Sequence, residues 1–195
     1  MKKLLILVFL ALFGTIYAQE IKQIGSLPFI KYFSQKEYKA APRNWSATQD
    51  ALGNIYVAND NGSVLVYDGS NWTTIKISTN SPIRSVNFIN NKIFIGGYNT
   101  FGFLKPNSNG QLSYLNLSNE LPKDSREFQD IWDIFQTKDS SLFFQSFEKI
   151  FIYKNKKFKT IKIDDIFPQG LFLISFQVNK EIYTYVKYKG IYKLT

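Results

Sequence analysis

Residues 44–77 read NWSATQDALGNIYVANDNGSVLVYDGSNWTTIKI, and this stretch determines how the rest of the chain is interpreted. Short runs in which apolar and polar residues alternate are separated by turns rich in Asp, Asn and Gly. This pattern is typical of β-strands joined by tight hairpins, because Asn-Gly and Asp-Gly accept positive φ at little cost. The stretch therefore predicts four consecutive antiparallel strands, at 45–48, 55–59, 63–67 and 72–77.

The same order of strands and turns recurs along the chain. The predicted second strands hold Tyr56, Phe94, Phe143 and Tyr183, separated by 38, 49 and 40 residues. Four-stranded repeats of about 40–45 residues are typical of β-propeller blades, which bury their faces by stacking on one another. We therefore predict an all-β fold of propeller blades with four antiparallel strands each, incomplete because the last is truncated, at about 44–78, 83–118, 128–163 and 171–195.

Two features of this fold stay open at the level of sequence. A β-sandwich could use the same strands, although it does not require their recurring length and turn order. The last unit holds only three predicted strands, so the chain reads as the N-terminal part of a longer product or of a truncated gene. Residues 21–24 could supply a closing strand, and an open sheet edge near Thr195 predicts aggregation or marginal stability.

The N-terminus has the pattern of an export signal. Residues 1–18, MKKLLILVFLALFGTIYA, combine two lysines, an apolar stretch and a terminal small residue, and the alternative is an uncleaved anchor. Residues 19–43 form a lead segment, and no later run reaches the roughly 20 apolar residues of a membrane span. We therefore expect an exported protein, on the periplasmic or extracellular side of the membrane.

Composition excludes several kinds of chemistry. The chain has no Cys and no His, so disulfides, Ser-His-Asp triads, Cys-His nucleophiles and the usual zinc sites are excluded. The net charge is +9, and lysines are concentrated in residues 149–162. This run either meets an anionic partner, such as a polyanionic glycan or a membrane surface, or is the solvated face of a hairpin. Nucleic acid is not an expected partner of an exported chain.

Residues 25–72 resemble the opening of the bacterial two-component-regulator propeller sensors. That family shows a Gly-Pro lead, a Tyr-x-Ala segment, Asn-Trp, Gln-Asp, Gly-x-Ile-Tyr, an Asn-x-Gly turn and Tyr-Asp-Gly-x-x-Trp. Departures are Arg43, where a glutamine-like residue is usual, and the inserted Leu27. The matching residues are Gly25, Pro28, Tyr32, Tyr38, Ala40, Asn44, Trp45, Gln49, Asp50, Gly53, Tyr56, Ala58, Asn59, Gly62, Tyr67, Asp68, Gly69 and Trp72.

The resemblance implies a function as well as a fold. In that family a periplasmic propeller precedes a triple-tyrosine immunoglobulin-like domain, a membrane helix and a cytoplasmic output, typically a histidine kinase or a helix-turn-helix regulator. None of those later parts is found in this chain. The resemblance therefore implies that this chain supplies the sensing part of a signal-transducing protein.

A ligand site is expected where the starts of the innermost strands converge, at one end of the propeller axis. The residues predicted to bind there are Asn44, Trp45, Arg84, Asp130 and Trp132. The tryptophans could stack on sugar rings, although packing between blades is the alternative. The planar guanidinium of Arg84 could pair with an anionic group.

Other motifs do not support chemistry of their own. Residues 59–62 look like part of a calcium loop but lack its first acidic ligand, so a hairpin turn is predicted. Asp164 and Asp165 are adjacent and would point to opposite faces of a strand. Asp130 and Asp133 are an odd number of residues apart and would also point to opposite faces. Neither pair therefore predicts the two facing carboxylates of a glycosidase. We expect no catalytic residues, no cofactor and no metal.

Three functions are compatible with these features of the sequence. The first is a non-catalytic sensor or ligand-binding propeller that recognises a glycan or another small extracytoplasmic ligand. The second is an exported scaffold for protein interaction. The third, and least favoured, is a hydrolase or lyase that uses carboxylates on a polysaccharide.

Overall fold

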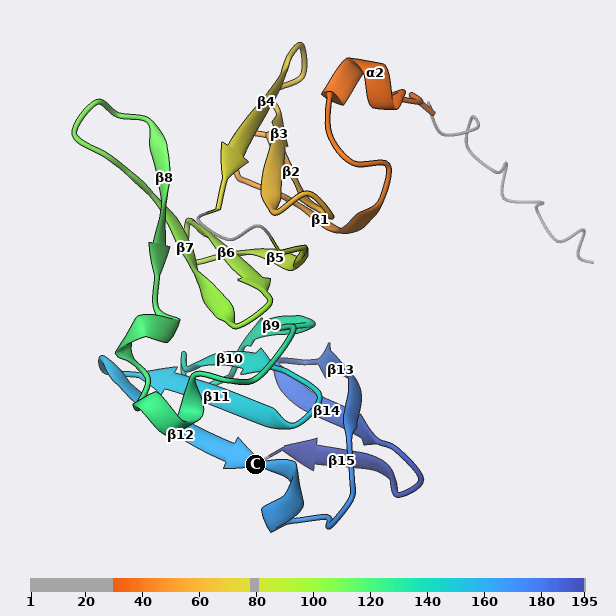
Figure 1. Ribbon diagram of the computed structural model, residues 1–195, viewed down its shortest axis with the longest axis vertical. Helices are drawn as coiled ribbons and strands as arrows, with labels where there is room; N and C mark the ends of the chain where they lie inside the picture. The colour runs from red at the N-terminus through yellow and green to blue at the C-terminus, as the bar shows by residue number, and fades with distance from the viewer. Residues whose placement is uncertain (1–29, 78–80, 195) are drawn as a thin grey trace, which may run out of the picture. The chain divides into compact units, whose positions relative to one another are not determined.

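The computed structural model describes residues 30–77 and 81–194 (Figure 1). Contacts divide the chain into two units, residues 1–32 and 33–195, and only residues 30–32 of the first are described. The export signal and the candidate closing strand at 21–24 lie outside the described residues.

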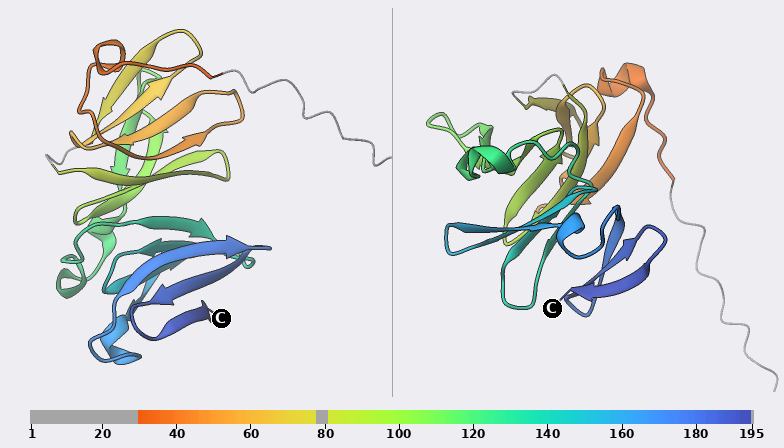
Figure 2. Two further views of the ribbon diagram at one scale, coloured as in Figure 1. Left: turned by 90° about the vertical axis from the view of Figure 1, so that its right-hand side faces the viewer. Right: turned by 60° about the horizontal axis from the view of Figure 1, so that its bottom comes forward.

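The second unit consists of four antiparallel sheets that follow one another along the chain (Figure 2). The first sheet contains β1 (Asn44–Gln49), β2 (Ile55–Asn59), β3 (Ser63–Tyr67) and β4 (Trp72–Lys76). The second contains β5 (Ile83–Ile89), β6 (Lys92–Gly97), β7 (Thr100–Pro106) and β8 (Leu112–Asn116). The third contains β9 (Asp133–Gln136), β10 (Leu142–Gln145), β11 (Lys149–Lys154) and β12 (Lys157–Lys162). The fourth contains β13 (Phe172–Val178), β14 (Glu181–Val186) and β15 (Gly190–Leu194).

The turns form for the reason the sequence predicts. Asn90 and Asn91, which join β5 to β6, both have positive φ, at 49° and 58°. Asn155 with Lys156, and Asn179 with Lys180, repeat this conformation in the third and fourth sheets. Two consecutive residues with positive φ match the right-handed twist of the flanking strands, and this conformation joins neighbouring strands in the second, third and fourth sheets.

Successive sheets meet along their innermost strands, β1, β5, β9 and β13. Side chains bridge these strands to the backbone of the next sheet. The Val86 amide donates to Ser46 Oγ over 2.8 Å, and the Phe88 amide donates to Thr48 Oγ1 over 3.1 Å. The Ser175 amide donates to Asp133 Oδ2 over 2.9 Å. The inner strands thus satisfy backbone groups across the gap without merging into one sheet.

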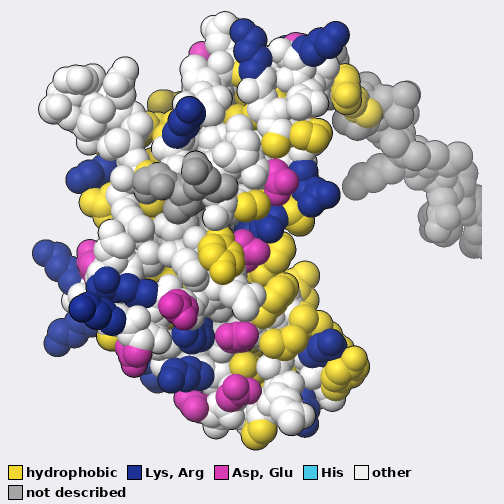
Figure 3. All heavy atoms as spheres, viewed as in Figure 1, with side chains coloured by type: hydrophobic (Ala, Val, Ile, Leu, Met, Phe, Trp, Pro, Cys, Tyr) yellow, Lys and Arg dark blue, Asp and Glu magenta, His cyan; other side chains and the backbone are white. Residues whose placement is uncertain are grey.

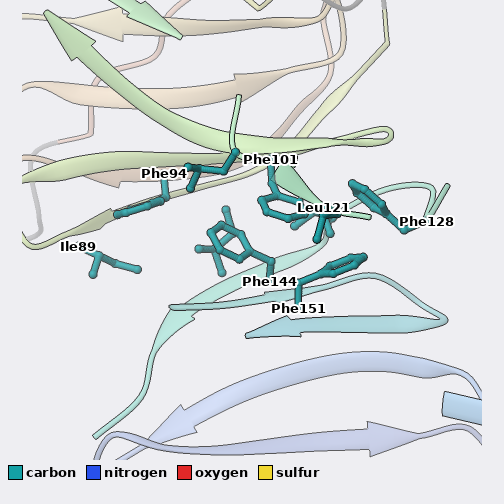
Figure 4. Packing of buried hydrophobic residues seen from close by; sticks show 10 residues of the cluster. Ile89, Phe94, Phe101, Leu121, Phe128, Phe144 and Phe151 are labelled. Atoms are coloured by element: carbon teal, nitrogen blue, oxygen red, sulfur yellow. The ribbon is translucent and has the colours of Figure 1, made fainter. Parts of the chain in front are cut away.

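Apolar side chains fill the spaces between neighbouring sheets. Phe101 and Phe144, which are fully buried, stack with ring centroids 4.4 Å apart between the second and third sheets (Figure 4). Two further clusters lie between the first and second sheets and between the third and fourth. The central cluster contains Ile89, Phe94, Phe101, Leu117, Leu121, Phe128, Ile131, Ile134, Phe144 and Phe151.

These sheets confirm the predicted all-β fold of propeller blades. A sandwich would have two sheets packed face to face, whereas this unit has four, each packed on the next through a core of its own. Helices are short: α2 (Gln35–Tyr38) precedes the first sheet, and the 3₁₀ turns η1 (Ser118–Glu120), η2 (Lys123–Ser125) and η3 (Ile163–Asp165) lie between later sheets. Asp164 and Asp165 lie in η3 and therefore belong to the connection between the third and fourth sheets.

The segment before β1 packs on the first sheet. The Phe33 ring lies edge-on to Tyr67 and Trp72, at centroid distances of 4.7 and 5.2 Å. Buried Asn59 ties the same segment to the sheet, because its Nδ2 donates to the Ala41 carbonyl over 2.8 Å and its Oδ1 accepts from the Ala41 amide over 3.2 Å. This segment is therefore part of the folded unit.

Candidate functional site at the axial end of the inner strands

The inner strands share a backbone irregularity near their starts. The pairing of β1 with β2 skips Trp45, and the pairing of β5 with β6 skips Arg84. In the fourth sheet the skipped residue is Leu173. Trp132 stands directly before β9, and its amide donates to the Gln145 carbonyl over 2.8 Å. A bulge re-aims the side chain of the extra residue, so successive sheets present one such side chain each at the same end.

Arg84 lies between two carboxylates. Its Nε is 3.2 Å from Asp130 Oδ1, and its Nη1 is 3.4 Å from Asp60 Oδ1. The exposed fractions are 16% for the Arg84 side chain, 18% for Asp130 and 31% for Asp60. Such partial burial strengthens the attraction relative to a surface ion pair.

Two tryptophans enclose the same guanidinium. The Arg84 Cζ atom lies 4.1 Å from the Trp45 ring centroid and 5.2 Å from that of Trp132. The two indoles meet edge to face with centroids 5.7 Å apart. Trp45 Nε1 also donates to Asp60 Oδ1 over 2.8 Å. We call these five residues the axial cluster: Trp45, Asp60, Arg84, Asp130 and Trp132.

Several buried polar atoms of this region have no hydrogen-bond partner. They are Arg84 Nε, Asp130 Oδ1, Trp132 Nε1 and, from the adjoining end of β10, Gln145 Nε2. Arg84 Nε and Asp130 Oδ1 are close enough for an ion pair, but they are not aligned for a hydrogen bond. In the described residues the only other such side-chain atom is Trp72 Nε1. Unsatisfied buried groups are uncommon in folded proteins, so their concentration here marks the region as a candidate for binding.

The structure brings together four of the five residues predicted from the sequence. Trp45, Arg84, Asp130 and Trp132 meet in the axial cluster, and ligand binding by them stays a prediction. Asn44 instead faces the first sheet, where its Oδ1 accepts from Asn59 Nδ2 over 2.7 Å. Arg84 Nε and Nη1 already face carboxylates of its own chain, and pairing of Arg84 with an external anion stays a prediction.

Sequence reasoning missed Asp60 and Phe147. Phe147 stacks on Trp132 with centroids 5.2 Å apart, and Asp60 completes the surroundings of Arg84. Both follow the second strand of their sheets. In an antiparallel meander the turn after the second strand lies at the same end as the start of the first. Strand order therefore places both turns at the axial end, but it does not show which of their side chains contact Arg84 or Trp132.

Asp133 occupies the next position inward from Trp132. Burial raises the pKa of its carboxyl above the ordinary value, and the hydrogen bond from the Ser175 amide partly opposes the rise. Gln145, fully buried beside it, bonds to the Ser175 hydroxyl through Oε1. Polar groups thus continue from the axial cluster into the interface between the third and fourth sheets.

Within residues 30–77 and 81–194 no three side chains of His, Cys, Asp or Glu are grouped so that they could hold a metal ion. A search of the described part of the chain for a helix both long and apolar enough to cross a membrane finds none.

Comparison with known proteins places this geometry in context. No family model matches the chain, and no curated protein matches it. Among solved structures, the extracellular domain of a protein described as a hybrid two-component system of B. thetaiotaomicron superposes with a TM-score of 0.60 at 18% identity. This match covers 83% of the chain and 22% of that structure. The chain has the propeller fold of two-component extracellular domains.

Two further matches agree with this fold. A second extracellular domain of this kind from B. thetaiotaomicron gives a TM-score of 0.52 at 14% identity over 78% of the chain and 23% of that structure. YCF48 from Cyanidioschyzon merolae gives 0.56 at 16% identity, over 78% of the chain and 50% of that structure. The chain thus spans between about a fifth and a half of the structures it resembles, and the likeness is one of fold.

Proposed function

We propose that this chain is the ligand-binding part of an extracytoplasmic sensor, non-catalytic by itself, and that the axial cluster binds a neutral, polyhydroxylated ligand such as a glycan fragment. The concentration of unsatisfied buried polar atoms carries this proposal. Trp132 Nε1 lacks an acceptor, and Arg84 Nε and Asp130 Oδ1 face each other at 3.2 Å without an aligned hydrogen bond. A hydroxyl group can both donate and accept, so sugar hydroxyls match this mixed requirement.

The charge of the cluster favours a neutral ligand. One Arg and two Asp give a formal charge of −1, and both carboxylates already face the guanidinium. An anion would lie close to Asp60 and Asp130 and be repelled by both, whereas a hydroxyl can donate to Asp130 Oδ1, which accepts no hydrogen bond. The likeness to extracellular domains of two-component systems supports the sensing role.

Binding should change the environment of the tryptophans. The unsatisfied atoms are buried, so a ligand reaches them only when neighbouring side chains shift, and the Trp45 and Trp132 rings lie against Arg84. Trp45, 37% exposed, is the outermost of these rings. Titration of the chain with a panel of neutral oligosaccharides should therefore give a saturable change in tryptophan fluorescence. A Trp72→Phe background removes the third tryptophan, which lies in β4 away from the cluster.

The test compares two tryptophan positions. Trp45→Ala should weaken binding at least about tenfold, since truncating an aromatic anchor at a binding site costs about 2 kcal/mol or more. Trp72→Phe should bind like the original chain. Absence of a saturable response to every neutral sugar, with the chain shown to be folded by circular dichroism, would overturn the proposal. Polysaccharide turnover that disappears in Asp130→Asn would support a hydrolase or lyase instead.

A further inference from the structure

Aromatic side chains are unevenly distributed between the turns at the two ends of the sheets. The turns after the second strands lie at the axial end, and three of the four contain an aromatic residue: Tyr98, Phe147 and Tyr188. The described turns at the other end, after the first and third strands, contain none. They are rich in Asn, Asp, Gly and Lys instead, and lysines gather over the turn from β11 to β12 at the lower left of Figure 3. The two ends therefore differ in chemistry, although their turns have the same structural role.

Tyr98 lies directly beside the axial cluster. It forms an isolated antiparallel bridge with Asp130, and next to this bridge the Ile131 amide donates to the Gly97 carbonyl over 3.1 Å. Side chains of directly paired residues stand on the same face, so the Tyr98 ring and the Asp130 carboxylate are neighbours. The Asp130 carboxylate in turn faces Arg84. Tyr98 thus extends the axial cluster by one aromatic ring.

The backbone around this bridge is held in an uncommon conformation. Asn99 and Gln129, the residues adjoining Tyr98 and Asp130, have positive φ, at 50° and 60°. Asn99 Oδ1 accepts from the Phe128 and Gln129 amides over 2.8 Å each, and the Asn99 amide donates to the Gln129 carbonyl over 2.8 Å. Gln129 lies in the connection between two sheets and not in a hairpin. Non-glycine residues held in the left-handed region by surrounding bonds concentrate at ligand sites.

The Tyr98 ring is 46% exposed on this rigid backbone. Within residues 30–77 and 81–194 no aromatic ring packs on it, and its hydroxyl has no hydrogen-bond partner. Phe147 differs, because it is half-buried and stacks on Trp132. A tyrosine combines an apolar ring with a polar tip, which suits it to a ligand that has both apolar and hydroxyl-bearing surfaces. Tyr98 therefore offers a free platform next to the cluster, whereas Phe147 supports Trp132.

On the basis of the proposed function, in which the axial cluster holds one sugar unit, we propose that Tyr98 forms a second subsite for the adjoining unit. The ligand is then an oligosaccharide and not a monosaccharide. The Tyr98 ring stacks on the apolar face of the second unit, and its hydroxyl bonds to a sugar hydroxyl. Because Asn99 already fixes the backbone, little of the binding free energy is lost in ordering this turn.

The test measures how affinity depends on the length of the sugar chain. Neutral sugars built from glucose, mannose, galactose or xylose, each as monosaccharide, disaccharide and tetrasaccharide, are titrated into the full chain by calorimetry. In the series that binds, the disaccharide should bind at least about tenfold more tightly than the monosaccharide, because its second unit gains an aromatic anchor.

Substitution of Tyr98 should remove this gain. In Tyr98→Ala, disaccharide binding should weaken at least about tenfold while monosaccharide binding stays unchanged. Tyr98→Phe keeps the ring and should retain most of the gain. Trp45→Ala should weaken both sugars, since it alters the cluster itself. Leu52→Ala, at an 87% exposed position in the turn between β1 and β2, is the control at the other end of the sheets and should bind every sugar like the original chain.

The outcomes separate the second subsite from the axial cluster. Equal affinity for monosaccharide and disaccharide would overturn the second subsite and leave binding by the cluster in place. The same holds for an equal loss of both in Tyr98→Ala, or for a disaccharide gain that survives in this variant with its fold confirmed by circular dichroism. Failure of every sugar to bind the folded chain would overturn the proposed function together with the subsite.

Discussion

Asp133 carries a carboxylate into the interface between the third and fourth sheets. Because burial raises its pKa, its carboxylate is disfavoured in the folded chain relative to the unfolded one. Its stabilising contribution is therefore complete below the unfolded pKa, near 4, and is lost as the pH rises through the folded value. At neutral pH the charged side chain lowers the free energy of unfolding, although its bond to the Ser175 amide offsets part of this effect.

Asp133→Asn should raise the free energy of unfolding by about 1 kcal/mol at pH 7, because the amide oxygen still accepts from Ser175 without a buried charge. The gain should disappear as the pH falls towards 4. Urea unfolding at several pH values measures both effects. Asp165→Asn, at an exposed position in η3, is the control and should change neither quantity. A destabilised Asp133→Asn chain at neutral pH would contradict this prediction.

The hairpin turns depend on the backbone preferences of the few residues that form them. Lys156 in the turn between β11 and β12 has a φ of 59°, a conformation that costs a non-glycine residue about 1–2 kcal/mol. With Lys156→Gly, Asn155 and the new glycine would form an Asn-Gly pair, which is a favoured pair for a two-residue hairpin turn. We expect the free energy of unfolding to rise by about 1 kcal/mol, as measured by urea unfolding.

The control for this change has the opposite sign. Lys105→Gly, in the exposed end of β7, should lower the free energy of unfolding by about 0.5–1 kcal/mol, since glycine gains nothing in an extended strand. If both glycines destabilise the chain, the turn does not hold Lys156 in the left-handed region.

Strands and turns could be predicted because their signals lie within a few residues, as in Asn90-Asn91. The axial cluster could be predicted in part, since Trp45, Arg84 and Trp132 stand at matching places before or in inner strands. Its charge balance could not, because Asp60 looks like any turn residue until the sheets are placed side by side. The cleft of about 650 Å³ between the third and fourth sheets depends on how two sheets pack on each other, which no short stretch of sequence encodes.

Because each sheet packs on the next, a substitution in one core should affect the neighbouring sheets more than the distant ones. Phe144 is fully buried between the second and third sheets and stacks on Phe101. Phe144→Ala should lower the free energy of unfolding by about 3–5 kcal/mol, because it leaves a cavity in the central core. In repeat architectures each module depends mainly on its neighbours, so amide protection should fall most in β5–β12 and least in β1–β3.

Hydrogen exchange measured by mass spectrometry tests this distribution. Phe176→Ala is the matched control, because Phe176 is 39% exposed at the fourth sheet and, among the aromatic rings of the described residues, stacks only on Tyr183. It should change the free energy of unfolding by less than about 1 kcal/mol. Equal loss of protection in all four sheets of Phe144→Ala would show that the unit unfolds as one block.

The residues that the strand pairing skips determine which side chains a propeller of this kind presents at the axial end of its inner strands. Trp45, Arg84 and Leu173 stand outside the ladder that holds their sheets together, so their identity is decoupled from the pairing around them. Substitution at these positions changes the side chains presented at the axial end of the inner strands and leaves the backbone pairing of the sheets in place. Under the proposed function, diversifying these positions together is the direct route to propellers with altered selectivity.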